Sequence, residues 1–301
     1  MIDAHIHIAL PCAGKDTVNA ARIGNILSAY TRAGVYAMRD GGDGYGASML
    51  ARDIAKDMGI LYKSPLYALY KKGHYGKFLG RPVNDLHDLQ NALDELLSKQ
   101  PDHMKIVLTG IVDFDSFGET GDIGFSKEEL VRMVNAAKER ELPVMIHCNG
   151  AKAVQMAVEA GADTIEHGYF LEYEQLCAMK ECKTVWVPTL APLVNFLKSG
   201  KASENQAQVV RKTIAQHGES ICKALAMGVM VAQGSDAGAT AVEHIQGIRD
   251  EYACFAALGL EEETLKQCNI EYGMQALHLT QAEKAIVQSR IAWRKSFDER
   301  E

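Results

Sequence analysis

Histidine, lysine and aspartate residues recur in or just after short apolar runs along most of this chain, and this placement constrains the fold more than any other feature. The first run, Ile2–Ile8, contains His5 and His7. The other members of the set belong to four later runs: Lys105, His147, His167 and Asp236. Each run has the length and composition of a β-strand. Such side chains at the ends of successive strands are typical of a metal site in a barrel.

Strand-like and helix-like segments alternate along the whole sequence. The predicted strands are Ile2–Ile8, Val35–Met38, Leu61–Tyr70, Met104–Leu108, Pro143–Ile146, Ala162–Ile165, Thr184–Val187 and Val229–Ala232. The predicted helices are Thr17–Ala33, Ala47–Met58, Asp85–Lys99, Ser126–Glu141, Ala151–Ala160, Glu172–Glu181 and Ser203–Met227, with further helices after them. Eight strand–helix pairs without a break in composition predict an α/β fold, a single (β/α)8 TIM barrel spanning residues 1–301. The charged segment Arg290–Glu301 is expected to fray.

Composition narrows the cellular setting and the partners. The 301 residues are 47% hydrophobic, which is enough for a large core, and the net charge is −7 without a basic run. Nucleic acid and anionic membranes are therefore not expected partners. The sequence lacks an apolar stretch of the roughly 18 residues that a transmembrane helix needs, and its first residues do not resemble a signal peptide. The seven cysteines lack disulfide-framework spacing, which indicates reduced thiols and a cytoplasmic location.

The candidate residues point to a metal centre at one end of the barrel. His5 and His7 are two residues apart on a strand, so their side chains share a face. Active sites of such barrels lie at the carboxyl ends of the strands, where the other candidates fall. Imidazole and carboxylate ligands suit Zn, Fe, Mn or Ni, and zinc is the first choice. Taken singly, each residue has a structural explanation: Asp236 could cap a helix, and the stem of Lys105 could cover apolar surface. The full set favours a metal.

Several motifs together resemble the amidohydrolase superfamily, the metal-dependent hydrolases built on a barrel. The first strand, IDAHIH, resembles the opening motif of that superfamily. The chain is most similar to its branch of cytoplasmic prolidases and amino-acid-amide hydrolases, over about residues 1–275. The segments that carry this narrower resemblance are GVYAMRDGG (34–42), GHYG (73–76), MKI (104–106), HCNG (147–150), IEHG (165–168), VPTL (187–190) and GSDAG (234–238).

The resemblance implies a binuclear site. One metal would be held by His5, His7 and Asp236, the other by His147 and His167, and Lys105 would bridge the two as its carbamate. The alternative is an uncarboxylated lysine and one metal. Two cations lower the pKa of a bound water, so that hydroxide can attack a carbonyl carbon.

The resemblance also implies catalytic roles and a substrate class. Asp236 would move the proton to the leaving nitrogen. His74, in the loop after the third predicted strand, is expected either to contact the substrate or to lie exposed. The expected substrate is a small molecule with an amide bond, such as a dipeptide or an N-acyl amino acid.

Two further charged features have competing interpretations. Arg39 could pair with a substrate carboxylate, but an internal salt bridge with Asp40 is the favoured interpretation. The loop after the fourth predicted strand carries four acidic residues, Asp113, Asp115, Glu119 and Asp122. This loop could favour a cationic substrate, although a solvated acidic loop explains it more simply.

Two departures from the superfamily pattern bear on the domain organisation and the function. Segments for the small β-sandwich that most relatives carry are not recognised, so we expect a bare barrel whose flank is covered by the C-terminal helix or by a homo-oligomer contact. Deaminases of the superfamily usually place a glutamate three residues after the histidine of the fifth strand, and Gly150 occupies that position here. A mononuclear deaminase is therefore disfavoured. A lactone or cyclic-amide hydrolase and an inactive metal-binding scaffold remain as alternatives.

Overall fold

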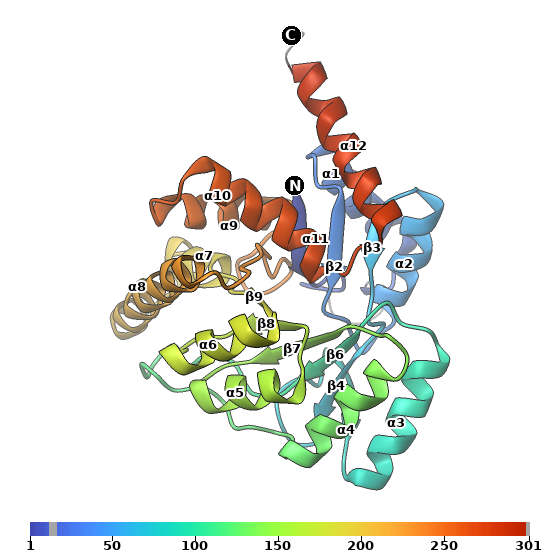
Figure 1. The fold of residues 1–301 in the computed structure, drawn as a ribbon, viewed down its shortest axis with the longest axis vertical. Coiled ribbons are helices and arrows are strands. Elements are labelled where there is room, and N and C mark those ends of the chain that lie inside the picture. The colour runs from blue at the N-terminus through green and yellow to red at the C-terminus, as the bar shows by residue number, and fades with distance from the viewer. Residues whose placement is uncertain (12–16, 299–301) are drawn as a thin grey trace.

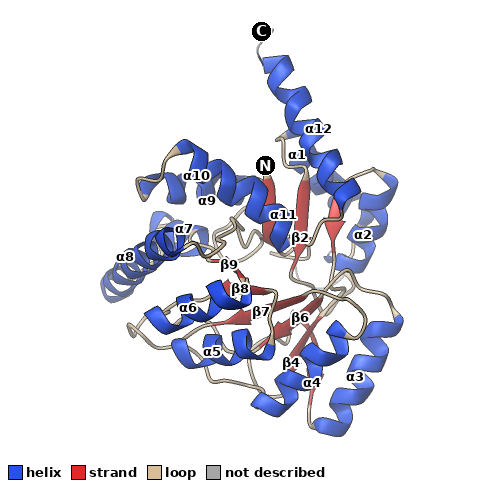
Figure 2. Cartoon of the chain, viewed as in Figure 1, coloured by secondary structure: helices blue, strands red, loops and turns tan. Residues whose placement is uncertain are grey.

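The computed structural model describes residues 1–11 and 17–298, and shows parallel strands enclosed by helices (Figures 1 and 2). The strands are β1 (Ile2–Ile6), β2 (Ala37–Asp40), β3 (Leu61–Lys63), β4 (Ala68–Lys71), β5 (Gly80–Val83), β6 (Met104–Val107), β7 (Val144–Cys148), β8 (Thr164–His167) and β9 (Val185–Val187). The helices up to the eighth are α1 (Ala20–Arg32), α2 (Ala47–Asp57), α3 (Leu86–Ser98), α4 (Lys127–Lys138), α5 (Ala151–Ala160), α6 (Tyr173–Cys182), α7 (Ala191–Lys198) and α8 (Glu204–Met227). The last are α9 (Gln246–Ala257), α10 (Glu262–Lys266), a π-helical turn (Gln267–Glu271), α11 (Tyr272–Ala276) and α12 (Gln281–Asp298).

The strands follow one another around a ring. One sheet has the order β1-β2-β3 and the other has the order β5-β4-β6-β7-β8-β9, and the pairs within both are parallel. Residues 230–237 connect β9 with β1 through parallel bridges of Val231 with Trp186 and of Ala237 with Ile6. On the other side, Ser64 accepts a backbone hydrogen bond from Asp102 between β3 and β6. The chain therefore has the TIM-barrel architecture that the alternation predicts.

Four local features differ from the predicted pattern. The predicted strand Leu61–Tyr70 is interrupted between β3 and β4, because Pro65 has no amide hydrogen to donate and Leu66 is left-handed, with φ 67°. The edge strand β5 lies where a loop was expected, and its Pro82 is tolerated because an edge strand leaves one side unpaired. The short helix α7 was also not predicted. Around Val231 the eighth strand is reduced to isolated bridges.

The helix ends behave as their sequences predict. Ser126 caps α4 and forms a reciprocal capping box with Glu129. Gly161 ends α5 in the left-handed conformation, with φ 98°, which a residue with a side chain seldom adopts. The tail Arg290–Glu301 is helical through Asp298, whereas residues 299–301 lie outside the described residues, so its fraying stays a prediction. Helix α12 projects away from the barrel (Figure 1).

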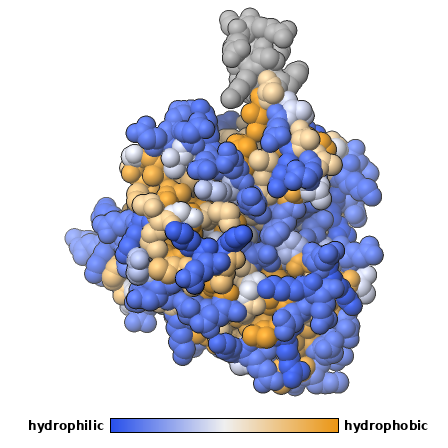
Figure 3. Space-filling model, viewed as in Figure 1, coloured by the Kyte–Doolittle hydropathy of each residue, from blue (hydrophilic) through white to orange (hydrophobic). Residues whose placement is uncertain are grey.

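The core lies between the strands and the surrounding helices. Its largest cluster includes Leu69, Ile106 and Ile146 from the strands together with Leu130 and Val154 from the helices. Hydrophilic residues cover most of the face shown in Figure 3. In the described part of the chain, helices long enough to cross a membrane are too polar to do so.

Candidate metal centre

The six candidate ligands converge at the carboxyl ends of the strands. His5 lies in β1 and His7 just after it, while Lys105, His147 and His167 belong to β6, β7 and β8. Asp236 lies between the two bridges that close the ring, at Val231 and Ala237. The imidazole centroids of His5 and His167 are 5.1 Å apart, and those of His147 and His167 are 4.6 Å apart. The barrel thus gathers residues that are up to 231 positions apart in the sequence (236 − 5) into one site.

His5, His7 and Asp236 form the tightest group. The Nε2 atoms of the two histidines are 3.3 Å apart, and Oδ1 of Asp236 lies 3.6 Å from the first and 3.4 Å from the second. Atoms of all three side chains that can bind a metal lie within 4.8 Å of one another. A divalent cation accepts this donor set of two nitrogens and one oxygen.

The orientation of His5 is fixed by a buried acid beneath it. Nδ1 of His5 donates to the carboxylate of Glu166 at 2.7 Å, which leaves Nε2 free to face the site. Glu166 is in turn paired with Arg39 at 2.8 Å, and both side chains are almost fully buried. The expected pairing of Arg39 with Asp40 is therefore wrong. The guanidinium lies beneath the site, where it balances the charge of Glu166.

Asp40 has its own role in the loop after β2. Its carboxylate accepts hydrogen bonds from the backbone amides of Ile8 and Gly42 and from the hydroxyl of Tyr62. These bonds connect the loop after β1 with the loop after β2, next to His7.

The second pair of histidines is also oriented by neighbours. Nε2 of His147 donates to the carbonyl of Gly110 at 3.2 Å, so Nδ1 is available for a metal. Nδ1 of His167 is 2.7 Å from the hydroxyl of Thr189, so Nε2 is available. Burial lowers the pKa of His147 to about 3 and lowers the pKa values of His5 and His167 well below the usual range. All three imidazoles are thus neutral, as metal ligands must be.

Lys105 provides the clearest sign that the site is built for another group. Its side chain is 1% exposed, and Nζ has no hydrogen-bond partner among the residues that the structure describes. Burial lowers the pKa of this amine to about 8. A buried amine without a partner is costly, so its place among four imidazoles is explained when it is neutral or chemically modified. The donor set and this unpaired amine both fit a metal centre.

Backbone geometry supports the same site. Asp236 and His167 have φ values of 54° and 65°, a region that non-glycine residues seldom adopt and that often marks functional positions. The amide of Asp236 donates to the carbonyl of His5 at 2.8 Å, which holds this turn against β1. Gly41 leaves room for the imidazole of His7, because a Cβ atom there would lie 2.3 Å from its Cε1.

A cavity of about 800 Å³ opens above these residues. His7, Lys105, His147, His167 and Asp236 line its floor. Its walls are mainly aromatic and aliphatic, and the ring of Tyr75 lies 5.5 Å from that of His147. A cavity of this size can enclose a small-molecule substrate.

The structure does not bring every candidate to this cavity. His74 is exposed and does not line it, whereas its neighbour Tyr75 does. The acidic side chains of the loop after β6 are also exposed, while Ile111, Val112 and Phe114 of the same loop line the cavity. This placement favours the interpretation of a solvated acidic loop.

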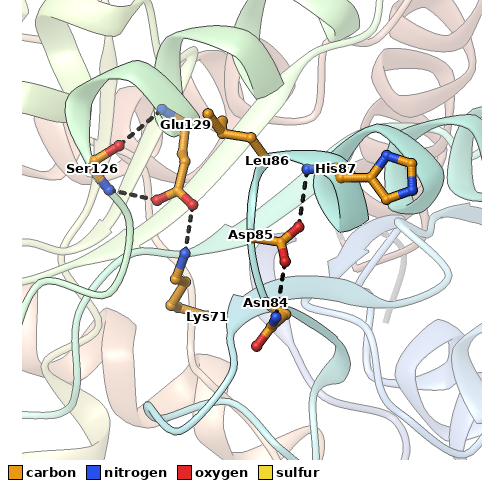
Figure 4. Close-up of a pocket in the computed structure, with 7 residues that line it drawn as sticks. All are labelled: Lys71, Asn84, Asp85, Leu86, His87, Ser126 and Glu129. Carbon is orange, nitrogen blue, oxygen red and sulfur yellow. Dashed lines mark hydrogen bonds and ion pairs between the residues drawn. The ribbon is translucent and has the colours of Figure 1, made fainter.

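A second, more open groove lies near the start of α3 (Figure 4). Its charged side chains are already paired within the protein, since Lys71 binds Glu129 and Asp85 caps α3. It also lies apart from the candidate ligands, none of which lines it. The chemistry of the chain therefore belongs to the larger cavity.

Sequence reasoning missed the residues that orient the ligands. Glu166, Thr189 and Tyr75 each contact a candidate histidine. One signal for Glu166 was available, because an acidic residue inside a short strand of a parallel barrel is buried and needs a partner. Tyr75 and Thr189 lie in two of the segments that carry the family resemblance, GHYG and VPTL, but their residue types alone do not predict these contacts.

Comparison with known proteins agrees with this geometry. The sequence model of the amidohydrolase family matches residues 1–279 of this chain. An uncharacterized protein of Mycobacterium tuberculosis is 26% identical over 265 residues, which are 86% of this chain and 68% of that protein. The ochratoxinase of Aspergillus niger is 30% identical over 125 residues, 40% of this chain and 26% of that enzyme.

Solved structures show the same fold. A Xaa-Pro dipeptidase with bound methionine in its active site has a TM-score of 0.74 and 22% identity, over 92% of this chain and 74% of that one. A prolidase complexed with N-methylphosphonate-L-proline has a TM-score of 0.76 and 21% identity, over 93% and 74% of the two chains. Together with the match over residues 1–279, these likenesses show that the chain belongs to the amidohydrolase family.

Proposed function

We propose that the protein is a metal-dependent hydrolase that cleaves an amide C–N bond of a small molecule, such as a dipeptide or an N-acyl amino acid. The observation that carries this proposal is the convergence of six candidate ligands on one centre. Three of the histidines, Asp236 and the buried Lys105 line the floor of one cavity, and His5 lies buried beside them. The relatives support it, because several are named as prolidases or as an ochratoxinase.

Two divalent cations fit the donor atoms. His5, His7 and Asp236 would hold one of them, and the free nitrogens of His147 and His167 would hold the other. Lys105, carboxylated at Nζ, would bridge the two, which would explain why its amine has no partner in the described part of the chain. Zinc is the first choice for this donor set, while Fe, Mn and Ni are the alternatives. Bound there, the cations would supply Lewis acidity and lower the pKa of water.

The side chains around the cations have their own tasks. The side chain of Asp236 is 13% exposed to the cavity, whereas His5 is fully buried, so Asp236 can reach a substrate. Its carboxylate would accept the proton of the attacking water and deliver it to the leaving nitrogen. The ring of Tyr75 would cover the substrate and exclude bulk water. Lys105 would act by holding the site together rather than by transferring the proton.

A turnover assay tests this proposal. Protein loaded with zinc in the presence of bicarbonate is assayed against dipeptides, N-acyl amino acids, cyclic amides and lactones. We expect hydrolysis of at least one amide. Asp236→Asn should lower kcat by at least about 100-fold, whereas Asp53→Asn on the exposed face of α2 should leave it unchanged. Hydrolysis of lactones alone, or turnover that survives in Asp236→Asn, would contradict the proposal.

A further inference from the structure

One wall of the cavity is a continuous apolar surface that begins at the metal centre. We define the apolar wall as Val112, Phe114, Tyr169, Leu193 and Phe196, which all line the cavity. The ring of Tyr169 is stacked on that of His167, with centroids 6.2 Å apart and planes at 17°. The rings of Phe114 and Phe196 pack against each other at 4.7 Å. The wall therefore extends from a candidate ligand to the outer part of the cavity.

The apolar wall is supported from behind, so it can act as a preformed surface. Its five residues belong to one hydrophobic cluster that also contains Val210 and Ile214 of α8. The hydroxyl of Tyr169 donates to the carbonyl of Thr189 at 2.8 Å, which fixes the ring next to His167. A close-packed wall with fixed side chains binds a large ligand more tightly than a small one, because the large ligand makes more van der Waals contacts.

The charges around the cavity are sparse. Among the described residues that line it, Glu243 carries the one formal charge outside the candidate ligands, and this charge is negative and exposed. Both ring nitrogens of His244 are already bonded, one to the hydroxyl of Tyr30 and the other to the carbonyl of Leu10. Arg39 lies beneath the site and is paired with Glu166. The described walls thus offer a substrate carboxylate no cationic partner.

From these two observations we propose that the preferred substrate is an uncharged amide whose bulky aromatic or branched apolar group packs against the apolar wall. This inference rests on the proposed amide hydrolysis and, among amides, favours uncharged compounds over dipeptides and N-acyl amino acids, which carry a free carboxylate. The scissile bond lies over the candidate ligands, and the apolar group extends past Tyr169 toward Phe114 and Phe196. A free carboxylate beside the scissile bond lowers the efficiency of cleavage.

Four compounds separate the effect of size from the effect of charge: N-acetyl-phenylalanine amide, N-acetyl-alanine amide and the two corresponding free acids. The measured quantity is kcat/KM for release of the acetyl group. We expect the phenylalanine amide to exceed the alanine amide by roughly 10- to 100-fold, the value of burying one aromatic side chain. Each amide should exceed its free acid by about tenfold or more.

Three variants of one loop assign the effect of size to the apolar wall. Phe114→Ala should lower kcat/KM for the phenylalanine amide by about tenfold and leave the alanine amide within about twofold. Phe117→Ala is the matched control, because this half-buried ring packs on Phe170 and does not line the cavity. Phe114→Leu, which keeps an apolar side chain, should retain most of the preference. Metal content and thermal melting check that each variant is folded.

The outcomes distinguish this inference from the proposed function. Equal or reversed preference for the phenylalanine amide, or faster cleavage of the free acids, would overturn the inference and leave amide hydrolysis intact. No turnover of any of the four compounds would count against the proposed function. In that case calorimetric binding of the four compounds to metal-free protein decides the inference alone, and tighter binding of the free acids would overturn it.

Discussion

At the scale of single residues, the site depends on groups that hold the histidines as much as on the histidines themselves. Glu166 orients His5, Thr189 contacts His167, and the carbonyl of Gly110 orients His147. Each contact uses one ring nitrogen and leaves the other available for a metal. Partners of this kind fix the tautomer and the position of a ligand before a metal binds.

Replacing the acid beneath His5 tests this account. Glu166→Gln keeps the shape of the side chain but removes the charge that faces His5 and Arg39. We expect metal affinity to fall by roughly 10- to 100-fold, measured by competition with a chromophoric chelator. Glu159→Gln, which changes an exposed acid paired with Lys127, is the control. Unchanged affinity in Glu166→Gln would show that the acid does not position His5.

A variant of Gly41 tests whether the position of the His7 imidazole matters for metal binding. A Cβ atom at position 41 would lie 2.3 Å from Cε1 of His7, so Gly41→Ala must displace the imidazole or the loop. We expect the variant to bind less metal per chain, as measured by elemental analysis. Gly44→Ala is the control in the same loop, since its nearest contact would be an ordinary 3.5 Å. Equal metal content in both variants would contradict the assignment.

The ligand residues could be predicted from the sequence because they share a pattern: two belong to the first strand and one to each of four later strands. Their supporting residues could not, because Thr189 and Tyr75 are common residue types whose role depends on which loops meet. Arg39 shows most clearly that contacts between distant residues cannot be predicted from the sequence. The sequence offered the adjacent Asp40 as a partner, while the barrel brings Glu166, 127 residues away, within 2.8 Å.

At the scale of the elements, the chain is predictable where a local signal decides the structure. The capping box of α4 and the glycine at the end of α5 are such signals, and both are confirmed. The interruption between β3 and β4 depends instead on two sheets that diverge at Pro65 and Leu66. A run of apolar residues alone cannot show which neighbouring strand each half of it will join.

One contact between helices α7 and α9 is expected to make the stability of the protein depend on pH. Glu251 of α9 is fully buried and accepts a hydrogen bond from the amide of Ala191 at the start of α7. Burial raises the pKa of this carboxyl group from its usual 4.5 to about 8. Between these values the folded protein binds more protons than the unfolded chain. Glu251 therefore makes the free energy of unfolding fall as pH rises from about 5 to about 8.

The variant Glu251→Gln should flatten this decline, which amounts to at most about 1.4 kcal/mol per pH unit. The measurement is urea unfolding of the wild type and the variant at several pH values between 5 and 8. Glu263→Gln, at an exposed position of α10, provides the comparison and should follow the wild type. An equally steep decline in Glu251→Gln would show that another group is responsible.

At the scale of the whole molecule, the ring of parallel strands explains how distant residues form one centre. Segments near both ends of the chain meet where residues 233–237 bond to β1. The alternation of strands and helices predicts the fold. It also predicts the end of the barrel at which the candidate ligands lie. It does not predict the shape of the cavity, because that shape depends on loops and on α7, for which the sequence gives no regular pattern.

We propose that this cavity holds two divalent cations bridged by the carbamate of Lys105. The most direct test is elemental analysis of protein purified without chelator and in the presence of bicarbonate. We predict about two metal ions per chain in the wild type, and a loss of metal in Lys105→Ala. A wild-type protein that binds no metal, even after reloading with zinc and bicarbonate, would show that these residues do not form a metal centre.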